Sequence, residues 1–159
     1  MMNRSTNYST RKKLPHEIPG WVRDGERYFI TVNAQDRQHN ELCSGGRAEA
    51  LLKSIAAYEA LGKWWIHVMV IMPDHVHMIA TFTKQHGIKP VISAWKGYQA
   101  RTLGIRWQSD YFEHRLRNTA EFSEKAHYIR LNPVRKQLVL EWTEWPYLFQ
   151  RGDWVARLS

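Results

Sequence analysis

Two histidines, His75 and His77, stand on either side of a single valine in the middle of an apolar segment. Apolar and β-branched neighbours favour a strand, and alternate side chains of a strand point to the same face. The two imidazoles are then about 6.6 Å apart along the strand, close enough to bind one divalent cation. The alternative is that the two histidines lie on a solvated strand face, because the triplet alone is a weak signal in a chain with 8 histidines.

Tyr128 and Asn132 form the second candidate group. They lie four residues apart at the end of a predicted helix, so they share one helix face. A tyrosine hydroxyl, with an ordinary pKa near 10, attacks phosphorus when a bound cation polarises the phosphate and a neighbour takes the proton. The Asn132 amide oxygen could join both histidines in a ligand set suited to Mg²⁺ or Mn²⁺. Taken singly, each residue is better explained as an ordinary helix residue.

Four strands and three helices are predicted to position these groups. Aromatic and β-branched residues favour strands at 27–33, 64–71, 75–82 and 111–116, and apolar spacing favours helices at 47–61, 90–103 and 120–131. Asn118 or Thr119 is the expected N-cap of the last helix, and Asn132-Pro133 is expected to close it or begin the next turn.

This order of elements predicts an α+β, ferredoxin-like (split β-α-β) fold, in which a four-stranded antiparallel sheet carries helices on one face. The third strand, which holds both histidines, is expected at the centre of the sheet or next to it. The face with the histidines then needs a cover other than the two crossover helices. Helix 120–131 is the free element, so we expect a C-terminal helix near the metal site.

The length of 159 residues is sufficient for one domain with its own core. We expect a flexible basic N-terminal arm at 1–20 and a single folded domain at 21–159. A single cysteine, Cys43, fits a reducing compartment. No segment has the pattern of a secretory signal or a membrane span, so the expected location is cytoplasmic, without a membrane partner.

A formal net charge of +8 makes nucleic acid the leading class of partner. The candidate phosphate contacts are basic residues of the second crossover helix and the fourth strand: Lys96, Arg101, Arg115 and Arg117. For the two strand residues a solvated face is an equal alternative. Trp95 and Trp107 could stack on bases, although core packing is the default for both.

Several motifs occur together in the order and spacing of a known family. They are Pro73-Asp74-His75-Val76-His77-Met78-Ile79, Trp107-Gln108, Tyr111-Phe112-Glu113-His114-Arg115-Leu116-Arg117 and Tyr128-Ile129-Arg130-Leu131-Asn132-Pro133-Val134. On these motifs the chain resembles the single-tyrosine transposases of the HUH superfamily, and most closely the REP-associated tyrosine transposases, which the Tyr-Ile-x-x-Asn-Pro-Val signature singles out. The resemblance covers residues 27–145.

The resemblance implies a metal-dependent DNA strand transferase in which Tyr128 attacks single-stranded DNA and forms a 5′-phosphotyrosine intermediate. It implies His75 and His77 as metal ligands and Asn132 as the third ligand, at a position where insertion-sequence relatives tend to have glutamine. The implied cofactor is Mg²⁺ or Mn²⁺. The implied substrate is an imperfect DNA hairpin with a short single-stranded flank, and the protein could be a monomer or a homodimer.

Two other functions remain open from the sequence. The same sheet architecture supports non-catalytic modules that bind single-stranded nucleic acid, although the paired aromatic pattern of RRM domains is missing. The other alternative is a metal-dependent nuclease in which water, and not Tyr128, attacks the phosphate.

Overall fold

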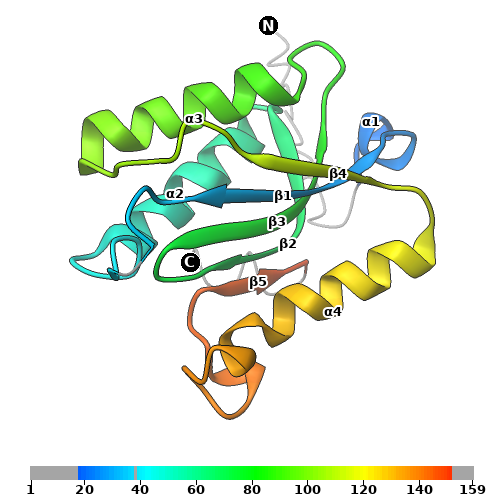
Figure 1. Ribbon diagram of the computed structural model, residues 1–159. Coiled ribbons are helices and arrows are strands. Elements are labelled where there is room, and N and C mark those ends of the chain that lie inside the picture. Colours follow the sequence, from blue (N-terminus) through cyan, green and yellow to red (C-terminus); the bar gives the residue numbers. More distant parts are fainter. Residues whose placement is uncertain (1–17, 38, 152–159) are drawn as a thin grey trace, which may run out of the picture.

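The computed structural model describes residues 18–37 and 39–151 (Figure 1). The proposed N-terminal arm therefore lies outside the described residues, except for its last three positions. The elements are α1 (Gly20–Arg23), β1 (Arg27–Asn33), α2 (Arg47–Ala60), β2 (Trp64–Ile71), β3 (His75–Phe82), α3 (Ile88–Leu103), β4 (Phe112–Leu116), α4 (Thr119–Arg135), η1 (Trp142–Glu144) and β5 (Leu148–Gln150). None of the helices in this part of the chain combines the length and hydropathy needed to cross a membrane.

The sheet has five strands in the order β4-β1-β3-β2-β5, and all neighbours are antiparallel. The α+β class and the central place of β3 agree with the sequence prediction. The prediction of four strands is wrong, because β5 adds a fifth beside β2, where Phe149 pairs with Met69. A strand of three residues is too short to show an alternating pattern, so only its tertiary pairing identifies it.

Helices cover both faces of the sheet (Figure 1). On one face α2 and α3 pack on a core that includes Ile55, Trp64, Met78 and Trp95. On the other face α4 contributes Ala126 and Ile129 to a smaller core. Helix α4 thus lies on the face of the sheet that α2 and α3 do not cover.

The tryptophans proposed as possible stacking residues are part of the larger core. Trp95 is fully buried and donates its indole N–H to Ser54 Oγ at 2.9 Å. Trp107 packs against the same core, with its ring centroid 5.4 Å from that of Trp95. Core packing therefore explains both side chains.

Helix α4 is longer than predicted. Asn118 caps its first turn, accepting a hydrogen bond from the Glu121 N–H at 2.9 Å, as expected for one of the two proposed caps. The helix does not end at Asn132-Pro133, however, but continues to Arg135. A proline without an N–H removes only one hydrogen bond here, and the helix ends soon afterwards with Gln137 at a φ of 58°.

Candidate metal and tyrosine site

The two histidines of β3 are buried, with 3% of His75 and 7% of His77 exposed. Cross-strand pairing places His77 opposite Thr31 of β1 and Val70 of β2, and Val70 belongs to the core beneath α4. The imidazoles therefore point to the α4 face, with ring centroids 4.4 Å apart. The alternative of a solvated strand face is wrong, because α4 covers it.

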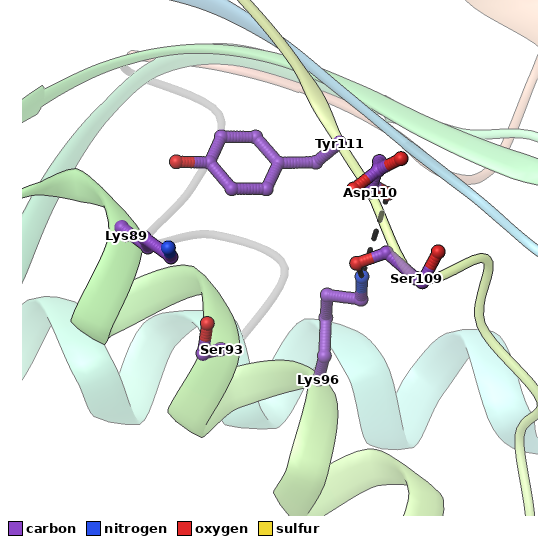
Figure 2. A pocket seen from close by; sticks show the side chains of 6 residues that line it. All are labelled: Lys89, Ser93, Lys96, Ser109, Asp110 and Tyr111. Atoms are coloured by element: carbon purple, nitrogen blue, oxygen red, sulfur yellow. Dashed lines mark hydrogen bonds between the residues drawn. The ribbon is translucent and has the colours of Figure 1, made fainter.

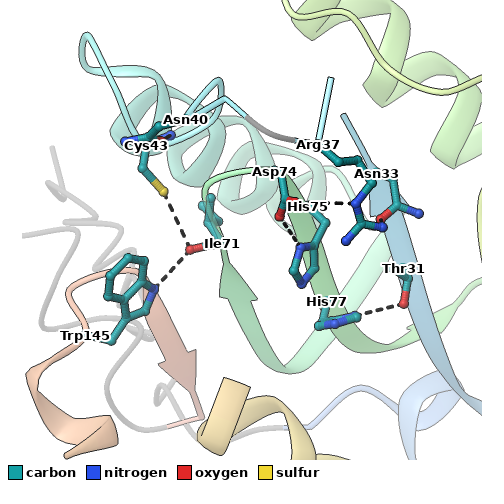
Figure 3. A network of polar contacts seen from close by, with 10 residues as sticks. All are labelled: Thr31, Asn33, Arg37, Asn40, Cys43, Ile71, Asp74, His75, His77 and Trp145. Carbon is teal, nitrogen blue, oxygen red and sulfur yellow. Dashed lines mark hydrogen bonds and ion pairs between the residues drawn. The ribbon is translucent and has the colours of Figure 1, made fainter. Parts of the chain in front are cut away.

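Each histidine uses its Nδ1 for a hydrogen bond inside the protein (Figure 3). His75 Nδ1 lies 2.6 Å from the Asp74 carboxylate, and His77 Nδ1 lies 2.8 Å from the Thr31 hydroxyl. A carboxylate accepts, so His75 donates from Nδ1 and its Nε2 carries the lone pair. With His77 in the same tautomer, both Nε2 atoms are available as ligands.

The Asp74 carboxylate also contacts a basic side chain. Arg37 Nε lies 3.4 Å from Asp74, and Arg37 Nη1 donates to the Asn33 side-chain oxygen at 2.7 Å (Figure 3). This places Asp74 between His75 and Arg37. One carboxylate oxygen contacts His75 and the other contacts Arg37.

Burial favours the neutral form of both imidazoles, since it lowers the pKa of each. Burial lowers the pKa of His77 to about 3, and the neighbouring His75, Arg37, Arg135 and Lys125 add to this effect. Burial also lowers the pKa of His75, although the hydrogen bond and negative charge of Asp74 act in the opposite direction. A neutral imidazole is the protonation state that binds a metal ion.

Tyr128 of α4 lies beside this pair. Its ring centroid is 5.6 Å from that of His77 and 6.0 Å from that of Phe29, and 40% of the residue is exposed. The tyrosine predicted as the nucleophile is thus next to the histidine pair and reachable from solvent. His77 and Tyr128 are 51 positions apart in the sequence, and the fold places their rings side by side.

Asn132, one helical turn after Tyr128 in α4, carries a buried polar group without a partner. It is 4% exposed, and its side-chain oxygen is buried without a hydrogen-bond partner in the described part of the chain. An unpaired buried amide oxygen costs stability, on the order of 1–3 kcal/mol, unless a further group binds it. No cluster of three or more His, Cys, Asp or Glu side chains that could hold a metal lies within residues 18–37 and 39–151. A third protein ligand beside the two histidines would therefore be a neutral group such as this amide.

Lys96, a predicted DNA contact, lies on the other face of the sheet in α3. Its ammonium group donates to the carbonyl oxygens of Gln108, Ser109 and Asp110, at 2.6, 3.3 and 3.5 Å. Figure 2 shows Lys96 in a hollow of about 300 Å³ formed with Lys89, Ser93 and Tyr111. Three backbone acceptors use all three donors of an ammonium group, so Lys96 fastens the loop before β4 to α3.

The other predicted DNA contacts are also away from Tyr128. Arg115 pairs across the sheet with Tyr28, whose ring packs on the α2–α3 side, and it contacts Glu26 at 3.4 Å. Arg117 follows β4, and Arg101 is exposed in the last turn of α3. The structure does not bring these arginines to the histidine pair.

Two basic residues that were not predicted from the sequence, Lys125 and Arg135, lie near Tyr128. Arg135 Cζ lies 4.2 Å from the ring centroid of Tyr128, and Arg135 also donates to the Tyr128 carbonyl oxygen at 2.7 Å. Lys125 Nζ lies 5.5 Å from the same ring. Their positions, three residues before and seven after Tyr128, place them on one helix face, so helical periodicity could have identified them.

Comparisons with known proteins identify the family of the chain. Residues 31–132 match the family model described as "Transposase IS200 like". The REP-associated tyrosine transposase of Escherichia coli K12 is 28% identical over 138 residues, which cover 84% of this chain and 81% of that protein.

Solved structures show the same relationship. A REP-associated tyrosine transposase bound to a REP hairpin superposes with a TM-score of 0.72 at 28% identity, covering 84% of this chain and 81% of the other. A Deinococcus radiodurans R1 protein, 19% identical, covers 71% of this chain and 94% of its own with a TM-score of 0.50, which shows a shared fold alone. The chain thus belongs to the IS200-like transposase family and, within it, resembles the REP-associated tyrosine transposases.

Proposed function

We propose that this protein is a metal-dependent single-stranded DNA transposase that cleaves and rejoins DNA at palindromic, REP-like hairpins through a 5′-phosphotyrosine. The observation that carries the proposal is the position of Tyr128, 40% exposed beside two buried histidines that each use Nδ1 for a hydrogen bond within the protein. Family membership supports a transposase function. The hairpin bound in the related structure supports the class of substrate.

In the proposed reaction the Tyr128 oxygen attacks the scissile phosphorus and gives its proton to solvent, which reaches this 40% exposed residue. The new bond joins the tyrosine oxygen to phosphorus, and the bond from phosphorus to the 3′-oxygen breaks. The released oxygen takes up a proton and becomes a 3′-hydroxyl. Attack by a 3′-hydroxyl on the phosphotyrosine reverses these steps, so the same residue can rejoin strands.

His75 and His77 through Nε2, with Asn132 through its side-chain oxygen, are the proposed ligands of Mg²⁺ or Mn²⁺. Such an ion, when bound, supplies a Lewis acid that polarises the phosphate oxygen. Lys125 and Arg135 contribute positive charge on the same side of α4, where the phosphate backbone must approach Tyr128. The proposed nucleophile, ligands and cations therefore belong to one region of the fold.

A trapping experiment tests the proposal. Single-stranded DNA with an imperfect hairpin, taken from palindromic repeats near the source gene and labelled at its 3′ end, is incubated with protein and Mn²⁺ and then run on a denaturing protein gel. We expect labelled DNA at a mass above that of the free protein. Cleaved DNA without this band would instead support hydrolysis by water, and bound but intact DNA would support the non-catalytic binding module.

The partners of the two imidazoles provide a separate prediction about metal affinity. Thr31→Val removes the hydroxyl next to His77 and should weaken Mn²⁺ binding about 10- to 100-fold, whereas Thr31→Ser should keep most of it. Asp74→Asn retains an acceptor for the His75 Nδ1–H but removes the negative charge. Its Mn²⁺ affinity therefore shows whether the orientation of His75 or the charge of Asp74 matters for binding. Isothermal titration with Mn²⁺ measures all three, and equal affinity in Thr31→Val and wild type would contradict the orienting role of Thr31.

Replacing Asn132 should change stability and metal affinity in opposite directions. Asn132→Leu removes an unpaired buried amide oxygen and substitutes an apolar side chain of similar shape, so thermal stability without metal should be equal or higher. Mn²⁺ affinity should fall, and Asn132→Asp should retain it because the oxygen remains. Thermal unfolding with and without Mn²⁺ checks both effects. Equal stabilisation of wild type and Asn132→Leu by Mn²⁺ would remove Asn132 from the ligand set.

A further inference from the structure

Phe112, the first residue of β4, is a large apolar side chain that folding leaves 55% exposed. It pairs with Thr31, and Thr31 pairs with His77 on its other side. Residues directly opposite in a sheet project to the same face, so Phe112 and His77 both lie on the α4 face. Two strand spacings separate them, about 10 Å between their Cα atoms.

A continuous set of aromatic rings connects Phe112 with the candidate site. Its ring centroid lies 6.2 Å from that of the buried Phe29, in an edge-to-face arrangement. Phe29 in turn contacts the rings of Tyr128 at 6.0 Å and His77 at 5.3 Å. Phe112 and Tyr128 are therefore the two solvent-exposed ends of an aromatic cluster that is joined by the buried Phe29.

Phe112 also lies at an open border of the sheet. Strand β4 is an edge strand, and its residues 112–115 are exposed. Positive charge is close by, since Lys125 Nζ lies 5.0 Å from the ring centroid of Phe29. Flat apolar rings together with cations are the combination by which proteins bind single-stranded nucleic acid, with bases stacked on the rings and phosphates near the cations.

We propose that Phe112 stacks on an unpaired nucleobase next to the phosphate that Tyr128 attacks, and so fixes the position of the strand at the site. The inference rests on the proposed function and adds to it a binding subsite and its ligand class. Because the Phe112 side chain is 55% exposed and every base has a flat face, the contact should tolerate any base and require that a base is present. Phe112 would thus position the strand without reading its sequence.

Binding measurements on a cleavage-inactive background test this subsite. In Tyr128→Phe protein, the additional change Phe112→Ala should weaken binding of the single-stranded hairpin with its flank roughly 5- to 100-fold. Phe112→Trp should retain the affinity, since a flat ring remains, and Phe112→Leu should lose most of it. The matched control is Tyr98→Ala, because Tyr98 is 46% exposed in α3 on the other side of the sheet and should not affect binding.

Abasic substitutions along the flank identify the base. For the protein with Phe112, one abasic position should weaken binding about as much as Phe112→Ala does, and in Phe112→Ala protein the same abasic position should have no further effect. If the losses of binding free energy from Phe112→Ala and from an abasic position add at every position, the stacking role is overturned. The same holds if Phe112→Ala protein binds as tightly as its parent. If the parent itself binds no hairpin, the proposed function and this inference fail together.

Discussion

Phenylalanine in place of Tyr128 should abolish cleavage of the hairpin and leave its binding unchanged. The substitution removes one oxygen atom, and in the proposed reaction that atom forms the bond to phosphorus. Loss of a nucleophile that a neighbouring site activates costs at least about 1,000-fold in rate. Cleavage of labelled DNA on a denaturing gel, with binding measured by gel shift on the same preparation, provides both readouts.

A loss of stability in Tyr128→Phe should not account for the loss of cleavage. The described residues show no hydrogen bond of the Tyr128 hydroxyl, and the residue is 40% exposed, so Phe should change the free energy of unfolding by no more than about 0.5 kcal/mol. Tyr98→Phe, at a tyrosine of similar exposure in α3, is the matched control and should cut DNA at the wild-type rate. Cleavage that survives in Tyr128→Phe would exclude Tyr128 as the nucleophile.

His77→Ala should remove both metal binding and metal-dependent cleavage. The outer partners of metal-binding histidines contribute about 10- to 100-fold in affinity, so loss of a direct ligand should exceed 100-fold. His75→Ala should behave alike, since the two rings lie 4.4 Å apart on one face of β3. Titration with Mn²⁺, together with cleavage rates at increasing Mn²⁺ concentration, measures the effect.

His39→Ala is the control for the histidine substitutions, because the His39 side chain is 78% exposed and lies outside the site. It should retain wild-type affinity and activity. Far-ultraviolet circular dichroism should confirm that His77→Ala remains folded, since a buried side chain is removed. Cleavage by the wild-type protein in excess chelator would contradict the metal dependence, and unchanged Mn²⁺ affinity in His77→Ala would contradict the ligand assignment.

The sequence was sufficient to predict the elements whose patterns are local. Strands β1, β2 and β3 match their predicted ranges, because alternation and β-branched residues are properties of a few adjacent positions. The pairing of His75 with His77 on one face follows from the same alternation. Helical periodicity likewise placed Tyr128 and Asn132 together on one side of α4. Each of these predictions depends on the covalent geometry of neighbouring residues.

The predicted end of α4 failed for the opposite reason. Asn132-Pro133 carries a strong local signal for a helix end, yet Pro133 lies inside the helix and is buried. Packing of this last turn against the protein compensates the lost backbone hydrogen bond, and packing is not visible in a local pattern. Strand β5 was missed likewise, since its identity depends on pairing with β2, some 80 positions earlier.

The sequence alone could not show which basic side chains lie near Tyr128. Lys96 and Arg115 are as basic as Lys125 and Arg135, but the sheet separates the first two from Tyr128 and α4 brings the last two to its ring. The sequence determined which residues are candidates for the chemistry, because alternation and helical spacing fix how neighbouring side chains point. Only the tertiary structure decided which of them meet, because strand order and helix docking depend on contacts between distant residues.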